Sequence, residues 1–316
     1  MNIVTLLPSA TEIICQLGLE NHLVGVSHEC DFPLSVKNLP KVTSTRVDHS
    51  ATSREIHRSV SELLKNAVSV YDLDLELLKS LKPDYLITQD LCDVCAVSYD
   101  QVEDACNQYL GPGTQVISLK PKTLNDIWDD IHRVGKTLNT LPSYQSFKET
   151  VDQTIRMIQN TIPPQPPTRP SILTVEWFQP VMIGGLWVPE MIDIIGGQCL
   201  MASPGQPAPT VSKDALSKIR PDVVIIKPCG FKLEQTLQEM DLLKSALPWE
   251  QWEVHLKGNA YLVDGNAYFN RPGPRILDSL KILAYCTHPT LFPEFGKQYS
   301  DAVIRLEPNL TVSSQK

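Results

Sequence analysis

Short runs of consecutive apolar residues alternate along the chain with segments in which apolar residues return every three or four positions. Residues 3–7 (IVTLL) and 85–88 (YLIT) are such runs in the first half, and residues 172–175 (ILTV) and 223–226 (VVII) are runs in the second. Runs that are apolar on both faces are typical of buried parallel strands, and the spaced segments are typical of covering helices. The pattern predicts an α/β protein with parallel sheets.

Two segments of the chain resemble each other. Residues 80–92 (SLKPDYLITQDLC) and 218–230 (KIRPDVVIIKPCG) both place a basic residue, Pro-Asp and an apolar run before a loop that contains cysteine. Near the start of each half, another apolar run is followed by an uncharged turn and a helical pattern. We therefore expect two similar lobes, each with a small parallel sheet and its helices.

A helical connection between the lobes is predicted from residues 124–162. Apolar residues in 124–138 and again in 144–162 fall at helical spacing, which indicates one long helix or two nearly continuous ones. The segment PPQPPTRP that follows has five prolines in eight residues and predicts a stiff extended link. The expected organisation is a first lobe (1–122), the bridging helix and proline-rich link (123–167), a second lobe (168–290) and a C-terminal tail, expected to be a surface appendage (291–316).

The N-terminal residues read as part of a folded domain. Ser9 followed by Glu12 predicts a capping box at the start of a helix that Gly18 ends. The segment lacks the basic start and small-residue cleavage site of a signal peptide, so we expect a cytoplasmic protein, or a periplasmic one if a leader has been removed. We find no apolar stretch of the ~18 residues that a membrane helix needs.

The composition excludes two other classes of protein. Of 316 residues, 42% are hydrophobic and 20% are charged, so the chain can bury a core and is not disordered. A net charge of −8 without a long basic run argues against nucleic acid as a partner. The eight cysteines are expected to be reduced in so large a leaderless chain, and the protein is expected to be a monomer.

Five loops follow predicted strands and carry polar or aromatic side chains. They span residues 28–33, 89–98, 176–190, 228–231 and 266–275. The carboxyl ends of strands in an open α/β sheet face the ligand crevice. These loops are therefore expected to line one cleft between the lobes.

The stretches LLPSATEI, LVGVSHECDFP, LKPDYLI, RPDVVII and FNRPGPRI resemble the periplasmic-binding-protein-like family with a helical backbone, the receptors of ABC importers. Within it, the resemblance is to the cobalamin-binding proteins. It implies two Rossmann-like lobes joined by one long helix, a cobalamin or related corrinoid as the small-molecule ligand, and an ABC permease as partner. Glu29 stands where those receptors have an aromatic residue, and Tyr268 matches a second aromatic position.

The candidate ligand-binding residues combine flat rings with directed polar groups. Aromatic side chains suit a large planar ligand, and asparagine and arginine would bind its amides, carboxylates or phosphate. The predicted set is His28, Glu29, Asp90, Trp177, Trp187, Cys229, Tyr268, Phe269, Asn270 and Arg271. Arg275 is expected to belong to the following helix, where it could pair with Asp278.

A metal site is a second interpretation of the first-lobe loops. Cys92 and Cys95 form the one close cysteine pair, and His28 and Cys30 could complete a zinc or iron site with them. His28 could instead serve as an axial ligand of cobalt or iron. The alternative is that Cys30 and Cys95 are small buried apolar residues and His28 is hydrogen-bonded inside a turn.

Three hypotheses of function remain. The first is a corrinoid-binding protein, the second a metal or iron–sulfur protein, and the third an enzyme on the receptor scaffold. In the third, Glu29, Asp31, Glu176 and Glu190 could act as acids or bases. Nucleotide-binding, hydrolase and metalloprotease motifs are absent, so binding is favoured over catalysis.

Overall fold

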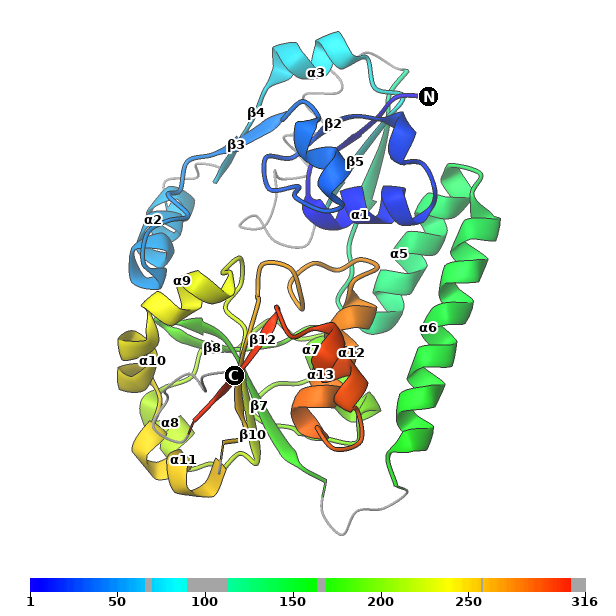
Figure 1. Ribbon diagram of the computed structural model, residues 1–316. Helices are drawn as coiled ribbons and strands as arrows, with labels where there is room; N and C mark the ends of the chain where they lie inside the picture. The colour runs from blue at the N-terminus through cyan, green and yellow to red at the C-terminus, as the bar shows by residue number, and fades with distance from the viewer. Residues whose placement is uncertain (66–69, 90–112, 164–168, 257, 308–316) are drawn as a thin grey trace.

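The computed structural model describes residues 1–65, 70–89, 113–163, 169–256 and 258–307 and has two α/β lobes, one above the other in Figure 1. The sheet of the first lobe is parallel, with the strand order β2-β1-β5-β6. Its strands are β1 (Ile3–Thr5), β2 (Leu23–Val26), β5 (Tyr85–Gln89) and β6 (Gln115–Leu119). A separate antiparallel pair, β3 (Thr43–Thr45) and β4 (Tyr71–Leu73), lies in the same lobe.

The sheet of the second lobe has the order β12-β11-β10-β7-β8, and β9 also pairs with β7. Its strands are β7 (Ser171–Phe178), β8 (Val181–Ile183), β9 (Gln198–Cys199), β10 (Val223–Ile226), β11 (Ala260–Val263) and β12 (Val303–Leu306). β8 and β12 run antiparallel to their neighbours, and the others are parallel. The predicted α/β class with parallel sheets is confirmed.

The predicted duplication is visible in the topology and in the hydrogen bonds. The parallel order β9-β7-β10-β11 repeats the order β2-β1-β5-β6 of the first lobe. Each Pro-Asp carboxylate accepts a backbone N–H from the start of the neighbouring strand: Asp84 from Asn2 at 2.7 Å and Asp222 from Ser171 at 2.8 Å. The two similar sequence segments therefore form the same part of each lobe.

Helices cover both sheets. Those of the first lobe are α1 (Pro8–Gln16), α2 (Ser53–Lys65) and α3 (Leu75–Leu81). Those of the second are α7 (Val188–Ile194), α8 (Lys213–Ser217), α9 (Leu233–Gln238), α10 (Met240–Ala246), α11 (Trp249–Leu256), α12 (Ile276–Thr287) and α13 (Pro293–Gln298). One hydrophobic core continues from α1 through the connecting helices into α7 and α12, so the lobes share buried apolar contacts.

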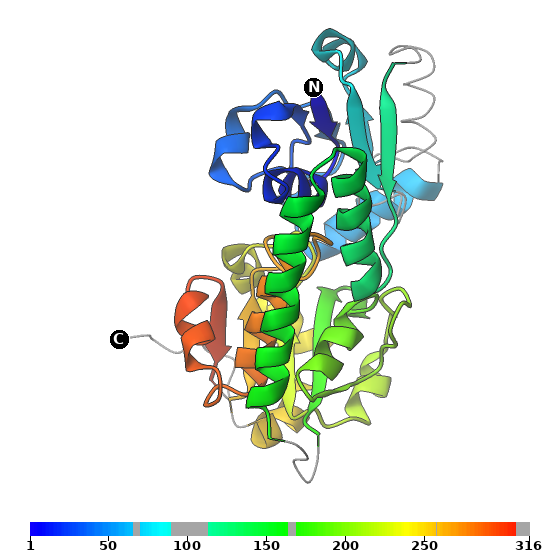
Figure 2. The same ribbon diagram turned by 90° about the vertical axis from the view of Figure 1, so that its right-hand side faces the viewer.

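The connection between the lobes corrects one expectation. α5 (Leu124–Thr137) and α6 (Leu141–Thr161) are neither one helix nor nearly continuous, because they pack side by side as a hairpin (Figure 2). Asn139 in the left-handed conformation (φ 59°) lies at the turn, and Pro142 suits the first turn of α6. α6 alone is the bridging helix, packed against α1 and against α7 and α12.

The segment after residue 290 is also different from the prediction. It is not a surface appendage, because residues 293–298 form α13 and residues 303–306 form β12 at the edge of the second sheet. The side chains of Val303 and Leu306 are buried there. β12 thereby covers the edge of β11, which would otherwise expose unpaired backbone groups.

The start of α1 differs from the predicted capping box. The N-cap is Leu7, which has no side-chain cap, and Pro8 takes the first helical position. Ser9 is buried inside the helix, and Glu12 is 3% exposed. The carboxylate of Glu12 is instead directed to the second lobe, as described below. Among the described residues, no helix is long and apolar enough to cross a membrane.

Candidate functional site

The carboxyl ends of both parallel sheets point toward the junction between the lobes (Figure 1). The loops after β2 and β3 reach this junction from the first lobe, and those after β7, β10 and β11 reach it from the second. The predicted loops therefore meet as expected from the topology, with the exception of residues 90–98, which lie outside the described residues.

A buried ionic network joins the lobes on one side of the junction. Arg271 donates to Glu12 at 3.2 Å and to Asp31 at 2.6 Å, and Arg275 donates to Glu12 at 3.0 and 2.5 Å. Burial raises the pKa of Asp31, but the hydrogen bond and charge of Arg271 outweigh it and hold that pKa below its ordinary value. The guanidinium of Arg275 also lies 4.3 Å from the ring centre of Phe32.

This network corrects the roles predicted for three residues of the loop 266–275. Arg271 is 7% exposed and committed to the two carboxylates, so in this conformation it does not offer its guanidinium to a ligand. Arg275 pairs with Glu12 and not with Asp278, whose carboxylate accepts from Tyr299. Asn270 accepts from Lys227 at 3.0 Å and donates to the Gly265 carbonyl at 2.8 Å, which makes it part of the loop's internal support.

Trp187 and Phe269 are core residues and not ligand-facing ones. Trp187 is 5% exposed and Phe269 is 1% exposed, and both belong to the core that spans the lobes. The indole N–H of Trp187 donates to the Phe269 carbonyl at 2.8 Å, and the Phe269 N–H donates to Ser279. Both rings are buried, so in this conformation neither is presented to a ligand.

A second polar contact joins the lobes on the side of α2. The backbone N–H of Ser53, at the start of α2, donates to Glu239 at 2.5 Å, and the Ser53 hydroxyl donates to the same carboxylate. Arg54 donates to Gln179 at 2.9 Å. Gln235 of α9 donates to the backbone carbonyl of His49 at 2.8 Å. α2 is thereby held against the second lobe.

Aromatic rings from both lobes gather at the junction. Phe231 of the second lobe is buried in the same hydrophobic cluster as Tyr71 of the first, and Trp177 packs against that cluster. The rings of Trp177 and Phe231 meet edge to face with centroids 5.2 Å apart, and those of His28 and Tyr71 are 5.6 Å apart. The indole nitrogen of Trp177 is buried and has no hydrogen-bond partner among the described residues.

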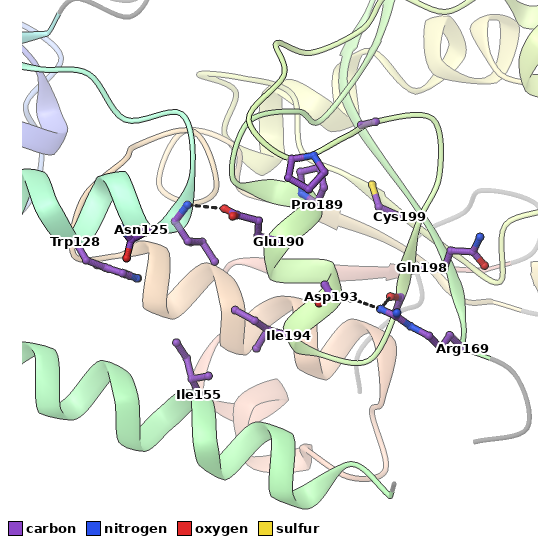
Figure 3. Close-up of a pocket in the computed structure, with 14 residues that line it drawn as sticks. Asn125, Trp128, Ile155, Arg169, Pro189, Glu190, Asp193, Ile194, Gln198 and Cys199 are labelled. Carbon is purple, nitrogen blue, oxygen red and sulfur yellow. Dashed lines mark hydrogen bonds and ion pairs between the residues drawn. The ribbon is translucent and has the colours of Figure 1, made fainter. Parts of the chain in front are cut away.

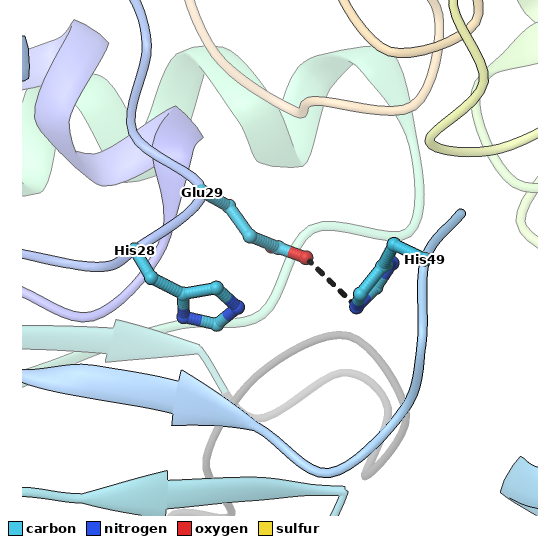
Figure 4. A group of neighbouring side chains, drawn as sticks. All are labelled: His28, Glu29 and His49. Atoms are coloured by element: carbon cyan, nitrogen blue, oxygen red, sulfur yellow. Dashed lines mark ion pairs between the residues drawn. The ribbon is translucent and has the colours of Figure 1, made fainter.

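His28, Glu29 and His49 form a compact polar group beside these rings (Figure 4). One ligand atom from each side chain lies within 4.8 Å of the other two. Thr43 lies 2.8 Å from Nδ1 of His28, while the buried Nε2 of His28 has no partner among the described residues. Burial holds the pKa of His28 below its ordinary value, so the imidazole is neutral near pH 7.

Only His28 and Cys30 of the predicted cysteine and histidine set lie within the described residues. Cys30 is 2% exposed, lies 3.0 Å from the Thr11 hydroxyl and does not belong to the compact group of His28. Burial raises the pKa of Cys30 to about 11, which disfavours the thiolate that binds metals. This placement agrees with the alternative of a buried apolar residue, and the four-residue metal site stays a prediction. Asp90, Cys92 and Cys95 lie outside the described residues.

Two other predicted residues keep accessible surface. Cys229 is exposed in the loop after β10. Tyr268 is half-buried, with its ring 5.9 Å from Tyr299 and 5.7 Å from the Arg275 guanidinium. Unlike Trp187 and Phe269, neither Cys229 nor Tyr268 is fully buried in the core. Their roles in ligand binding stay predictions.

A cavity of about 630 Å³ lies away from the junction, where α5 and α6 face α7 (Figure 3). Trp128 and Ile155 contribute apolar surface from the two connecting helices. Its charged groups are already paired, because Arg169 donates to Asp193 at 2.6 Å and Glu190 accepts the Leu124 N–H at 2.6 Å. Glu190, which the sequence suggests as an acid or base, thus helps to hold α5 against the second lobe.

Sequence reasoning missed His49, Tyr71, Phe231 and Glu239. His49 lies in the loop after β3, and Tyr71 lies in β4; both strands have three residues, which is too short to show alternation. Glu239 lies between two short helices. Phe231 could have been found from the sequence, because it is the last residue of the loop 228–231, which follows a predicted strand.

The chain is similar to known proteins in family and in sequence. A family model described as "Periplasmic binding protein" matches residues 3–247. A vitamin B12-binding protein of Vibrio vulnificus is 24% identical over 297 residues, covering 90% of this chain and 89% of the relative. One of Vibrio cholerae is 24% identical over 289 residues, with 90% and 88% coverage.

Solved structures share the fold at lower identity. The periplasmic vitamin B12 binding protein of Vibrio cholerae has a TM-score of 0.60 at 20% identity, covering 94% of this chain and 98% of the other. A periplasmic heme-binding protein of Roseiflexus has a TM-score of 0.66 at 18% identity, with 92% and 98% coverage. At these identities the structures support the two-lobed fold and do not separate one ligand from another.

Proposed function

Because this chain belongs to the periplasmic binding protein family and is a substrate-binding protein of the ABC-importer type, we propose that its ligand is a tetrapyrrole, specifically a corrinoid of the cobalamin class. The ligand would be held at the junction between the lobes and passed to an ABC permease. The named vitamin B12-binding relatives, similar over about nine-tenths of the chain, support a corrinoid over heme.

The observation that carries this proposal is the set of rings contributed by both lobes. His28 and Tyr71 come from the first lobe, and Phe231 and Trp177 come from the second. Large flat rings with few rotatable bonds suit a macrocycle, because they supply contact area at a small cost in entropy. Such rings on opposite lobes can take a planar ligand between them.

Binding of a macrocycle between these rings requires the lobes to separate locally, since Phe231 is buried against the first lobe. The indole N–H of Trp177 would then become a directed donor for a ligand amide or carboxylate. A buried donor without an acceptor costs about 1–3 kcal/mol, and a ligand acceptor would remove that penalty. A bound ligand would thus supply the acceptor that the indole N–H of Trp177 lacks among the described residues.

Titration with aquocobalamin, cobinamide and haemin, followed by visible absorbance and by thermal shift, tests the proposal. A band shift and a higher Tm are expected with the two corrinoids at micromolar concentrations. Replacing Trp177→Phe keeps the ring and removes the donor, which should weaken binding about two- to tenfold for a hydrogen bond of about 0.5–1.5 kcal/mol. Trp128→Phe, remote from the junction, is the matched control and should leave affinity unchanged.

Three outcomes would contradict the proposal or one part of it. Failure of all three compounds to bind at tens of micromolar would rule out a tetrapyrrole ligand. Binding of haemin alone would retain the tetrapyrrole class and exclude the corrinoid. Equal affinities of the Trp177→Phe and Trp128→Phe variants would exclude the indole N–H of Trp177 as a donor to the ligand.

A further inference from the structure

We propose that His28, Glu29 and His49 form a binding site for a divalent first-row transition metal ion, separate from any metal carried inside an organic ligand. The group supplies two imidazoles and one carboxylate, all from the loops that follow β2 and β3. This set of donors is one that zinc, cobalt and nickel ions accept.

His28 is oriented as a metal ligand is. Its Nδ1 lies 2.8 Å from the Thr43 hydroxyl, and that hydroxyl is held in turn by the Ser27 hydroxyl at 3.1 Å. Nε2 is left buried, directed into the group and without a partner among the described residues. Metal-bound histidines use their second nitrogen in such a contact, which fixes the ring and leaves the other nitrogen for the ion.

Glu29 and His49 are supported from two directions. Tyr71 donates its hydroxyl to the Glu29 carboxylate at 3.3 Å, and Nε2 of His49 lies 4.0 Å from the same oxygen. The backbone carbonyl of His49 accepts from Gln235 of the second lobe, which fixes the loop that carries the imidazole. The side chain of His49 is 48% exposed and the carboxylate of Glu29 is 31% exposed, so an ion can enter from solvent.

The spacing is compatible with coordination after a small adjustment. Metal–ligand bonds of about 2.0–2.2 Å place the donors of one ion about 3–4 Å apart. The three donors lie within 4.8 Å of one another, so a shift of about an ångström brings them together. The exposed ring of His49 can make that shift by rotating about its side-chain bonds, which exchanges the 3.2 Å contact of its Nε2 with the Thr45 hydroxyl for the ion.

Three converging donors also distinguish a simple ion from the metal of a tetrapyrrole. A macrocycle fills four positions around its metal and leaves one axial position on each face, so a protein surface can supply it one atom. A hydrated ion can exchange several neighbouring waters for protein atoms. The group therefore offers more donors than a tetrapyrrole metal can use from one side.

The test uses metal alone, on purified full-length protein from which any histidine tag has been removed. Zn²⁺ is titrated by calorimetry, and Co²⁺ serves as a probe whose visible bands report coordination by imidazole. We expect one ion to bind per chain, at the group of His28, Glu29 and His49. The variants His28→Ala, Glu29→Gln and His49→Ala should each weaken binding by more than tenfold, and Thr43→Val should weaken it by about tenfold through loss of orientation.

His57→Ala, an exposed histidine on α2 of the same lobe, is the matched control and should bind as the parent does. The proposal is overturned if Zn²⁺ and Co²⁺ do not bind at about 100 μM, a concentration well above the micromolar range of specific sites. It is also overturned if binding survives in the triple variant, or depends on Cys92→Ser and not on the three residues. Cobalamin titration of the Glu29→Gln and His49→Ala variants distinguishes this proposal from the proposed function, because neither side chain belongs to the rings proposed to hold a corrinoid and the metal can bind whether or not a corrinoid does.

Discussion

Replacing Glu12→Gln should destabilise the fold far more than the same substitution on the surface. The side chain of Glu12 is 2% exposed, and its carboxylate accepts from Arg271 and from Arg275. The substitution therefore removes the negative charge that these two buried guanidiniums share. Removing one partner of a buried ion pair costs about 3–5 kcal/mol. Arg271 keeps Asp31 and Arg275 keeps Phe32, so we expect the lower end, about 3 kcal/mol.

The expected result can be stated as a melting temperature. In a chain of this size one kcal/mol corresponds to about 2 °C, so Glu12→Gln should lower Tm by about 6 °C in calorimetry or circular dichroism. The matched control is Glu294→Gln, because Glu294 pairs with Lys297 at a side-chain exposure of 77% and 73%. Solvent screens that pair, and a change near zero is expected.

A double-mutant cycle separates the ion pair from packing. Combining Glu12→Gln with Arg275→Gln should cost less than the sum of the two single substitutions, since the second removes a buried charge that the first left unpaired. If Glu12→Gln melts within about 1 °C of Glu294→Gln, within the range of neutral surface changes, the assignment of a stabilising inter-lobe network is refuted.

Three further outcomes are expected from the burial and contacts of single residues. Brief alkylation of native protein with iodoacetamide at pH 8, followed by peptide mapping, should label exposed Cys229 and spare Cys30, whose pKa burial raises to about 11; early labelling of Cys30 would contradict its burial. Gly265→Ala should destabilise the protein by about 1–3 kcal/mol in urea, because the added Cβ would lie 2.0 Å from the Pro228 carbonyl oxygen, whereas Gly113→Ala, whose Cβ would have no atom of the described residues within 4 Å, should not. Burial alone raises the pKa of Asp126, but hydrogen bonds from the backbone of Lys122 and Thr123 at the start of α5 outweigh it and lower that pKa; its stabilisation is therefore present above the unfolded pKa of about 3.9 and lost as pH falls through the folded value. The stability gap between parent and Asp126→Asn in urea should accordingly narrow between pH 7 and pH 3, and a gap independent of pH would contradict this.

The fold was readable from the sequence where the signal is local. The Pro-Asp segments predicted the two lobes because each holds a strand that is buried on both faces, and such strands are uninterrupted apolar runs. The hairpin of α5 and α6 was not readable, since helical spacing reports the presence of a helix and not its direction. Strand β12 was missed because four residues, of which Arg305 is charged, give too short a pattern.

The sequence predicted where the candidate site lies better than it predicted which side chains form it. Topology brought the loop 266–275 to the junction, but whether Arg271 faces a ligand or a carboxylate depends on Glu12, which is 259 residues away in the chain. The same holds for His49, which meets Glu29 from another loop and Gln235 from the second lobe besides its local partner Thr45. Contacts of this kind form only when both lobes are folded, so no sequence pattern within a single loop predicts them.

The contact between Ser53 and Glu239 has a consequence for how tightly any ligand is held. If the lobes must part at the junction to admit a ligand, this contact belongs to the closed, unliganded arrangement and is lost on opening. The measured dissociation constant then equals the intrinsic one divided by the fraction of molecules already open. Affinity would be set partly by two residues that never touch the ligand, and weakening their contact would make the protein bind more tightly.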